Sequence, residues 1–316
     1  MRYNFEEEVK KAPKNWGRWG RDDEIGTLNY ITSEYLLDSL KVIRKGKVFT
    51  LGLWINRREG DPLWIGRKPT IHLMVRDESS YMVGKSKPRP GGGKSADDII
   101  IMHLQASTQV DALGHYWKDN TLYNGYDSKL TIGGLVKDDV SKLAEKGIVG
   151  RGVLLDVARY KGKSSLDKGE MISFQDLLET AKSEGVRLKK RDIILVRTGF
   201  LKTFYEKGAE EFYKDFNEPG ITYEPELVNW FYENEIIAYG SDTIASEQTY
   251  SSTLGIMLPL HIFFLNYLGM PIMEMLWLEE LAEDCSRDGQ YEFFFVASPL
   301  KVIGGTGSPI NPVAIK

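Results

Sequence analysis

The feature that most constrains the fold is an uncharged apolar run, LGIMLPLHIFFLNYLGMPIM, at residues 254–273. Its length is close to that of a bilayer span, which takes about 20 residues. However, Pro259 suits the first turn of a helix, and Gly269 suits the position just after the last turn. Together they predict a helix over 259–268, which is too short to cross a membrane. The run therefore favours a buried core helix, and we expect no membrane insertion.

The rest of the chain alternates between runs typical of strands and runs typical of helices. Apolar, β-branched runs predict strands over 99–107, 151–158, 192–199, 236–242 and 291–300. Apolar periodicity and capping residues predict further helices over 33–41, 173–184, 225–234 and 276–283. A cluster of Pro, Gly and Lys over 85–98 predicts a flexible surface loop. This alternation is typical of an α/β domain with a mixed or parallel sheet.

The size and charge of the chain narrow the class of protein. Its 316 residues fit one elaborated α/β domain, 1–316, and 42% hydrophobic residues suffice for a large core. A formal net charge of −4, with no basic stretch interleaved with aromatics, argues against nucleic acid as a partner. The single cysteine, Cys285, excludes an internal disulfide and suits a reducing compartment. Because the first residues also lack the apolar core of a signal peptide, we expect a cytoplasmic protein.

Four side chains with lone pairs recur at short spacings in LQASTQVDALGHYW, residues 104–117. They are Gln105, Gln109, Asp111 and His115. In an extended chain the first three would share one face, with His115 on the turn beyond. Asp111 is the one charged residue between Ile99 and Trp117, and a carboxylate buried there without a cation would be costly. Either a metal site has been rebuilt with glutamines, or no metal binds here.

A second candidate cluster follows in the apolar run and just beyond it. His261 stands at the start of the predicted helix, and Glu274 is flanked by two methionines. Glu274 is interpreted either as a metal ligand or as an N-terminal cap of the next helix, which its charge would also suit. Asp242 and Ser246 follow a predicted strand, a typical position for pocket residues. The remaining histidines, His72 and His103, are interpreted as structural.

These motifs resemble the cyclase-type metal-dependent hydrolases, a family with the hallmark His-x-Gly-Thr-His-x-Asp-x-Pro-x-His. The same frame here is Gln105-Ala-Ser-Thr-Gln109-Val-Asp111-Ala-Leu-Gly-His115, so both leading histidines are glutamines. This glutamine version resembles the branch that contains trans-dienelactone hydrolase. Further stretches similar to the family are NWGRWGRDDEIGTLNYIT (15–32), GRGVLLDVAR (150–159) and PLHIFFLNYLGMPIMEMLWLEEL (259–281).

The resemblance implies a fold and a set of roles. The fold would be a single mixed α/β domain whose sheet closes on a barrel-like core with helices around it. Gln105, Gln109 and Asp111 fall where the family has its first metal ligands, and His115 falls on its general acid/base. His261 and Glu274 match a later pair that completes a second metal site, although in single-metal members the later histidine lines the reacting water.

The glutamines alter the metal site that the resemblance implies. An amide oxygen is a weaker zinc ligand than an imidazole nitrogen. The strong ligands would then be Asp111, His261 and Glu274, a trio similar to a catalytic zinc or manganese site with an open position for water. Alternatively, Gln105 and Gln109 hold oxygens of the substrate.

The function expected from this comparison is hydrolysis of a small molecule. We expect a metal-dependent hydrolase that opens a small cyclic ester or amide, or cleaves an aryl or formyl amide. His115 would move the proton of a metal-activated water. A serine nucleophile is excluded because the chain has no Gly-x-Ser-x-Gly elbow. The alternative is a non-catalytic protein that binds a small molecule on a retained cyclase fold.

Assembly is the last expectation. Aromatic residues gather in NWGRWG (15–20) and WFYENE (230–235), and exposed patches of this kind commonly mark subunit interfaces. They predict a homo-dimer or homo-tetramer. The alternative is that these side chains fill the core of a large domain.

Overall fold

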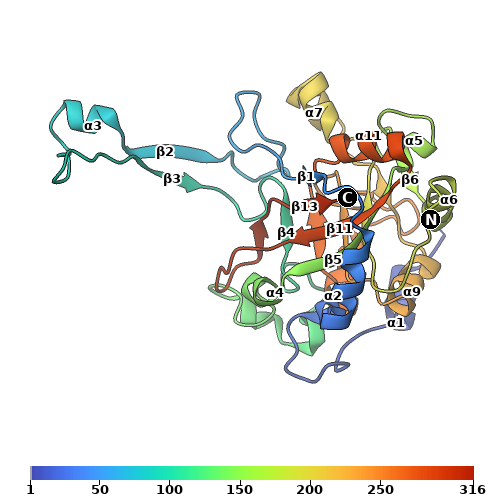
Figure 1. Ribbon diagram of the computed structural model, residues 1–316. Coiled ribbons are helices and arrows are strands. Elements are labelled where there is room, and N and C mark those ends of the chain that lie inside the picture. The colour runs from blue at the N-terminus through green and yellow to red at the C-terminus, as the bar shows by residue number, and fades with distance from the viewer. Residues whose placement is uncertain (1) are drawn as a thin grey trace.

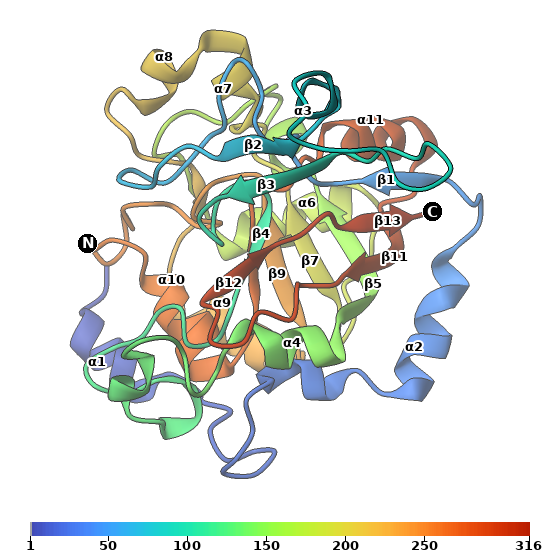
Figure 2. The same cartoon turned by 90° about the vertical axis from the view of Figure 1, so that its left-hand side faces the viewer.

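A nine-stranded mixed sheet forms the centre of the computed structural model, which describes residues 2–316. The strand order is β1-β13-β11-β5-β7-β9-β10-β4-β12, and the sheet curls into a half-barrel with helices around it (Figure 1, Figure 2). The strands β5, β7, β9 and β10 run parallel to one another, and the other pairs in this sheet are antiparallel. The predicted single-domain α/β fold with a barrel-like core is therefore confirmed.

Most strands are short, and β5 is the longest. Their bounds are β1 Val48–Thr50, β2 Ile71–Arg76, β3 Asp97–Ile101, β4 Gln109–Asp111, β5 Ile148–Leu155, β6 Met171–Ile172, β7 Ile193–Val196, β8 Gly220–Ile221, β9 Ala238–Ser241, β10 Ile272–Glu274, β11 Glu292–Ala297, β12 Gly307–Pro309 and β13 Val313–Ile315. The pairs β2–β3 and β6–β8 form two small sheets of their own. Strands β7 and β9 are buried along their whole length, which explains the continuous apolar sequence IILV of β7.

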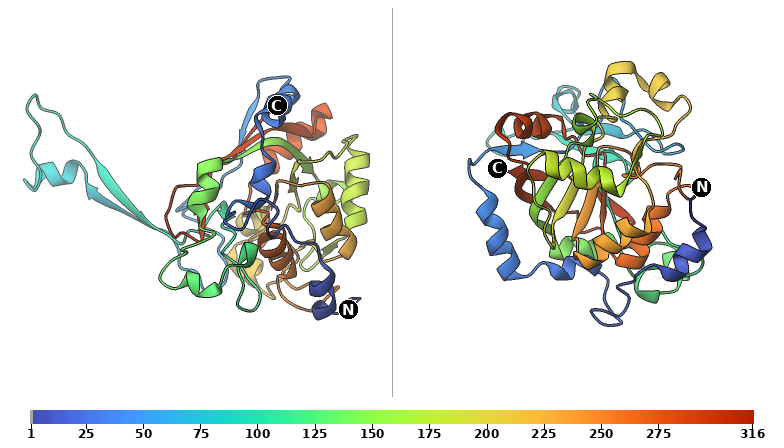
Figure 3. Two further views of the ribbon diagram at one scale, coloured as in Figure 1. Left: turned by 90° about the horizontal axis from the view of Figure 1, so that it is seen from below. Right: turned by 90° about the vertical axis from the view of Figure 1, so that its right-hand side faces the viewer.

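Helices cover the sheet and fill the connections. The α-helices are α1 Phe5–Lys11, α2 Ser33–Ser39, α3 Glu78–Met82, α4 Val140–Lys146, α5 Val157–Tyr160, α6 Phe174–Ser183, α7 Lys202–Lys207, α8 Ala209–Tyr213, α9 Pro225–Glu233, α10 Pro259–His261 and α11 Glu279–Asp288. Short 3₁₀ helices are η1 Gly26–Tyr30, η2 Leu40–Val42, η3 Tyr123–Gly125 and η4 Ser128–Thr131, and η5 Ile262–Leu268 is a π-helix. Helices α6 and α9 lie on one face of the sheet (Figure 3).

The apolar run of the sequence forms the predicted buried helix. Helix α10 begins at Pro259, and η5 continues it to Leu268 with every residue buried. Gly269 ends the helix with a φ of 60°, and a Cβ there would lie 2.3 Å from the Tyr123 ring, so only glycine fits. Within residues 2–316, no helix combines the length and the apolar character that a bilayer crossing requires.

The first and last strands of the chain meet at one edge of the sheet. Val48 of β1 pairs with Ile315 of β13, and β13 separates β1 from β11. Lys316 follows directly, with its side chain buried and its Nζ 2.9 Å from Asp284 Oδ2 and from Asp288 Oδ1. Residues from both ends of the sequence thus close the same side of the fold.

Two predicted elements differ from the structure. The run over 99–107 is not a buried strand, because β3 is exposed along its whole length and ends at Ile101. It pairs with β2 in an arm that projects from the body (Figure 1), and the predicted loop over 85–98 forms most of its tip. The helix predicted over 276–283 begins later, at Glu279, because residues 275–278 form the connection between β10 and this helix. The other predicted helices and strands are present within a few residues.

The two aromatic stretches contact the body of their own chain. Trp16, Trp19 and Trp230 are partly buried against the main core, and Trp16 Nε1 donates to Asn266 O at 2.7 Å. This placement does not test assembly, so the homo-dimer or homo-tetramer stays a prediction.

Candidate metal centre

Two adjacent antiparallel strands carry most of the candidate site. Gln109 of β4 lies opposite Glu274 of β10, and both strands are fully buried. Side chains alternate along a strand, so Gln109 and Asp111 point to the same face. Thr108 fixes this pair of strands, because its Oγ1 donates to Met275 O at 2.5 Å and accepts from Leu53 N at 2.9 Å.

Three ionisable side chains converge at this point. One ligand atom each from Asp111, His261 and Glu274 lies within 4.8 Å of the others, and all three residues are buried. His261 Nε2 is 3.3 Å from Glu274 Oε1 and 3.8 Å from Asp111 Oδ2. Among the residues that the structure describes, no other group of three histidine, cysteine or acidic side chains meets this criterion.

Asp111 is a buried carboxylate without a hydrogen-bond partner. Neither of its oxygens, and not Gln109 Oε1 either, has a partner within residues 2–316. Burial raises the pKa of Asp111, because charge is unfavourable in this apolar interior. Unpaired buried acceptors are rare in folded proteins, and three beside a histidine and a second carboxylate match the donor set of a cation. The residues present therefore fit a divalent metal ion.

His261 is held in an orientation suited to a ligand. Its Nδ1 lies 2.6 Å from Glu247 Oε1, which leaves Nε2 facing Asp111 and Glu274. Glu247 is itself fixed, since it accepts the backbone N–H groups of Leu260 and His261. A carboxylate behind a ligating histidine is a common way to set its tautomer and basicity. Burial alone would lower the pKa of His261, but Glu247 and Glu274 together raise it to about 10.

Glu274 acts within the site rather than as a helix cap. It ends β10, whereas the next helix, α11, begins at Glu279, so the cap interpretation is wrong. Gln109 Nε2 donates to Glu274 Oε2, and this contact leaves the amide oxygen of Gln109 as the unpartnered atom. Gln109 therefore belongs to the same cluster.

The other predicted site residues, Gln105 and His115, lie side by side next to that cluster. Gln105 Nε2 donates to Thr306 Oγ1 at 2.8 Å and is 3.4 Å from His115 Nδ1. His115 Nε2 is 3.8 Å from Asp111 Oδ1, and burial lowers the pKa of His115. The ring is thus neutral near neutral pH and faces the carboxylate. Arg67 adds a positive charge nearby, since its Nη1 donates to Gln105 O at 2.8 Å.

Several acidic and polar residues of the sequence motifs have structural contacts instead. Asp242 Oδ1 accepts from Thr198 and Asp242 Oδ2 from Gly199 N, and Ser246 Oγ donates to Met273 O at 2.6 Å. Both side chains are thus engaged within the chain, and their place in a pocket stays a prediction. Glu247, one residue after Ser246, is the site residue that the sequence analysis missed. Its partner His261 lies 14 positions away in the sequence. The two side chains meet because Glu247 lies at the N-terminus of α10, the helix that contains His261.

The two remaining histidines lie outside the cluster. His72 is exposed on the projecting arm, where its Nε2 is 2.6 Å from Asp98 Oδ2, and His103 is also exposed.

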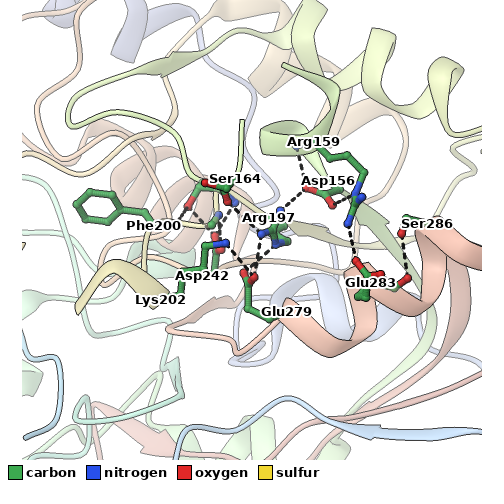
Figure 4. Close-up of polar contacts among 12 residues, drawn as sticks. Asp156, Arg159, Ser164, Arg197, Phe200, Lys202, Asp242, Glu279, Glu283 and Ser286 are labelled. Carbon is green, nitrogen blue, oxygen red and sulfur yellow. Dashed lines mark hydrogen bonds and ion pairs between the residues drawn. The ribbon is translucent and has the colours of Figure 1, made fainter. Parts of the chain in front are cut away.

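A second group of charges lies beside a cavity of about 670 Å³ on another side of the fold (Figure 4). Arg197 contacts Asp156 at 2.7 Å and Glu279 at 2.8 Å, and Lys202 reaches Glu279 at 3.4 Å. Arg159 contacts Asp156 and Glu283. Arg197, Lys202 and Arg159 are therefore all paired with carboxylates of the same chain.

Comparisons with known proteins agree with this picture. Residues 49–248 match the profile of a family described as "Putative cyclase". A crystal structure described as a novel cyclase is 36% identical, with a TM-score of 0.87, and the match covers 96% of this chain and 100% of that one. No protein of curated function matches the sequence.

Two more distant structures share the fold. Isatin hydrolase A from Labrenzia aggregata, bound to benzyl benzoate, is 17% identical with a TM-score of 0.60, over 89% of this chain and 97% of that one. An isatin hydrolase bound to the product analogue thioisatinate is 15% identical with a TM-score of 0.61, over 90% of this chain and 98% of that one. At these identities the likeness concerns the fold alone.

Proposed function

Since the chain belongs to the cyclase family, we propose that it is a metal-dependent hydrolase of a small molecule. The observation that carries the proposal is the buried trio of Asp111, His261 and Glu274, in which both oxygens of Asp111 lack a partner within the described residues. A paired carboxylate would suit a structural role, whereas an unpaired one beside two further donors suits a bound cation. The names of the distant neighbours also support hydrolase chemistry.

Each residue of the site has a distinct role in this proposal. Asp111, His261 and Glu274 would hold a divalent ion, which we take to be zinc or manganese, and the amide oxygen of Gln109 would be a weaker fourth donor. Such an ion, when bound, lowers the pKa of a water molecule and polarises a carbonyl group. Glu247 keeps Nε2 of His261 directed at the site.

His115 would move the proton of the reaction. Its Nε2 faces Asp111 and takes a proton from the attacking water as the water oxygen bonds to the carbonyl carbon. The same nitrogen then returns the proton to the leaving oxygen or nitrogen as the bond to carbon breaks. Gln105 would position His115 through the contact of its Nε2 with Nδ1, while the same amide nitrogen is held by its hydrogen bond to Thr306 Oγ1.

The substrate class we propose is a small cyclic ester or amide, or an aryl or formyl amide. Such substrates present a carbonyl for attack and need no nucleophilic serine or cysteine. Cys285, the one cysteine of the chain, is buried with its thiol pKa raised to about 12 by burial, so it is not a nucleophile. The alternative is a protein that binds such molecules on the same fold without turning them over.

Metal reconstitution tests this function. The protein is stripped with a chelator, dialysed and reloaded with Zn²⁺ or Mn²⁺, and metal content and acid release from lactones, lactams and arylformamides are measured. We expect about one ion per chain, and hydrolysis that depends on it. His115→Ala is the matched variant: it should keep its ion and lose roughly a hundredfold or more in rate.

Three outcomes would count against the proposal. Absence of tight binding for any divalent ion would remove the metal centre. A folded His115→Ala protein without its ion would show that His115 is a ligand. Metal-loaded protein that binds these compounds without releasing acid would instead support the binding protein.

A further inference from the structure

Arg67 is half-buried and has no carboxylate partner within residues 2–316. Six arginines of these residues are buried or half-buried. The other five each contact a carboxylate of the same chain, and they are Arg57, Arg76, Arg151, Arg191 and Arg197. A charge that is partly removed from water is costly unless it is paired. Arg67 is therefore the one arginine of this set whose anionic partner the described chain does not supply.

The segment that carries Arg67 is held against the body of the fold. Leu63 makes two hydrogen bonds with Tyr213, since its N–H donates to the hydroxyl at 2.6 Å and its carbonyl accepts from that hydroxyl at 2.7 Å. Trp64 packs edge-to-face on Phe216, with 5.9 Å between the ring centroids. Arg67 N then donates to Trp64 O at 3.0 Å and closes a turn. An anchored segment therefore presents the guanidinium, rather than a free surface loop.

This segment brings the guanidinium to the candidate metal centre. Arg67 Nη1 donates to Gln105 O at 2.8 Å, and Gln105 in turn contacts His115. Burial raises the pKa of Asp111 to about 6, and Arg67 is among the positive charges that oppose this rise. Burial lowers the pKa of His115, and the charge of Arg67 lowers it further. An arginine side chain has five N–H donors, and one of them has an acceptor within residues 2–316, so most of the fork is left for a ligand.

The hydrolysis proposed above creates a negative charge at this centre. As the water oxygen bonds to the carbonyl carbon, the electron pair of the carbonyl double bond moves onto its oxygen. As the bond to the leaving oxygen or nitrogen breaks, the leaving atom takes the proton held by His115, and the carbon keeps both oxygens. The acid so formed releases its remaining proton to solvent at neutral pH and becomes a carboxylate. A planar carboxylate matches the guanidinium fork, which can donate two parallel hydrogen bonds to it.

We propose that Arg67 receives the negative charge formed at the attacked carbonyl, first as the oxyanion and then as the carboxylate of the product. This inference rests on the proposed hydrolase function and adds a residue to it. Because the charge exists only after the attack, a donor already in place for it stabilises the transition state more than the bound substrate. Arg67 would therefore affect turnover and affinity for the product, and would have little effect on affinity for an uncharged substrate.

Affinity for a product tests the proposal without relying on turnover. The probe is the hydroxy acid formed from dihydrocoumarin, an uncharged lactone. Calorimetry measures its binding to wild type, Arg67→Gln and Lys68→Gln after each protein has been reloaded with Zn²⁺. Lys68 is exposed and adjacent, so Lys68→Gln removes the same charge as a control. We expect Arg67→Gln to bind the hydroxy acid at least about tenfold more weakly, and Lys68→Gln to bind it like wild type.

Steady-state kinetics supply a second measurement. With the uncharged substrate that reconstituted wild type hydrolyses fastest, Arg67→Gln should lower kcat by about a hundredfold at nearly constant KM, as when an oxyanion loses a donor. The metal content should not change. Guanidinium chloride added to Arg67→Ala should restore part of the rate, which a purely structural defect would not allow.

Several outcomes would overturn the proposal. Wild type that does not bind the hydroxy acid would do so, as would Arg67→Gln that binds it as tightly as wild type. Normal turnover of the uncharged substrate by Arg67→Gln, with a raised KM for the lactone of hydroxyglutarate, would assign the guanidinium to a carboxylate that the substrate already carries. Wild type that binds the hydroxy acid through Arg67 but hydrolyses no lactone, lactam or arylformamide would leave the carboxylate site in place and refute the hydrolase function.

Discussion

Arg197 and Asp111 are both buried and charged, and both stand at the end of a strand of the same sheet. Arg197 follows β7 and contacts Asp156 and Glu279, so its charge is neutralised within the chain (Figure 4). Asp111 ends β4, and neither of its oxygens has a hydrogen-bond partner among residues 2–316. The paired group is explained by the fold alone, whereas the unpaired one requires something the fold does not provide. Pairing, rather than burial, separates a structural charge from a functional one.

The largest effect is expected when the unpaired charge of Asp111 is removed. Asp111→Asn keeps the shape of the side chain and should lower hydrolysis by about a thousandfold, because a metal ion contributes several kcal/mol. Metal affinity should fall on the order of a hundredfold or more, since even partners behind a ligand contribute 10–100-fold. Chelator-treated Asp111→Asn should unfold no more easily than treated wild type, because an uncompensated buried charge has been lost. Metal analysis and denaturant unfolding measure both effects, and a clear loss of stability without metal would contradict the comparison.

Removal of the paired charge should have the opposite pattern. Arg197→Met leaves Asp156 and Glu279 without their buried partner and should lower the free energy of unfolding by about 3 kcal/mol or more. The metal content of the folded fraction should not change. Arg159→Met is the control, because its half-exposed side chain contacts the same Asp156 and should cost no more than about 1 kcal/mol. The denaturant midpoints of the two variants measure this difference in stability. Equal midpoints would show that the buried arginine stabilises the fold no more than the half-exposed one.

The smallest effects should separate the two glutamines. Gln109 lies in the cluster, so Gln109→His should tighten zinc binding by up to about tenfold, because imidazole is the better zinc donor. Gln105 contacts His115, so Gln105→His should leave zinc affinity unchanged and lower kcat. Competition with a zinc chelator and steady-state kinetics distinguish these outcomes. Equal tightening by both variants would place both glutamines at the metal.

Sequence pattern predicted well those elements whose own residues show which face is buried. The helices over 173–184 and 225–234 have apolar faces, and in the structure Ser173 is the N-cap of the first and Pro225 begins the second. The run over 99–107 misled, since an apolar β-branched run does not reveal whether its own chain covers it.

Sequence pattern singled out most of the side chains that lie together in the structure, but not how they are arranged. Spacing singled out Gln105, Gln109, Asp111 and His115, because an extended chain would bring the first three to one face. The chain is not extended there, since Ser107 has a φ of 64° and β4 begins only at Gln109. Gln105 contacts His115 instead. Glu247 escaped notice because its role depends on a tertiary contact with His261.

During synthesis on the ribosome, β1 leaves the exit tunnel long before the strand that will pair with it. Val48 cannot pair until Ile315 has been synthesised. At a translation rate of roughly 5–20 residues per second, this delay is on the order of tens of seconds. Throughout that time the sheet lacks its β13 strand, and β1 has no place to dock. Because contacts between such distant positions also form slowly, this edge of the sheet matures late in folding. Until β13 has been made, the nascent chain is therefore exposed to misassembly at the strand β1.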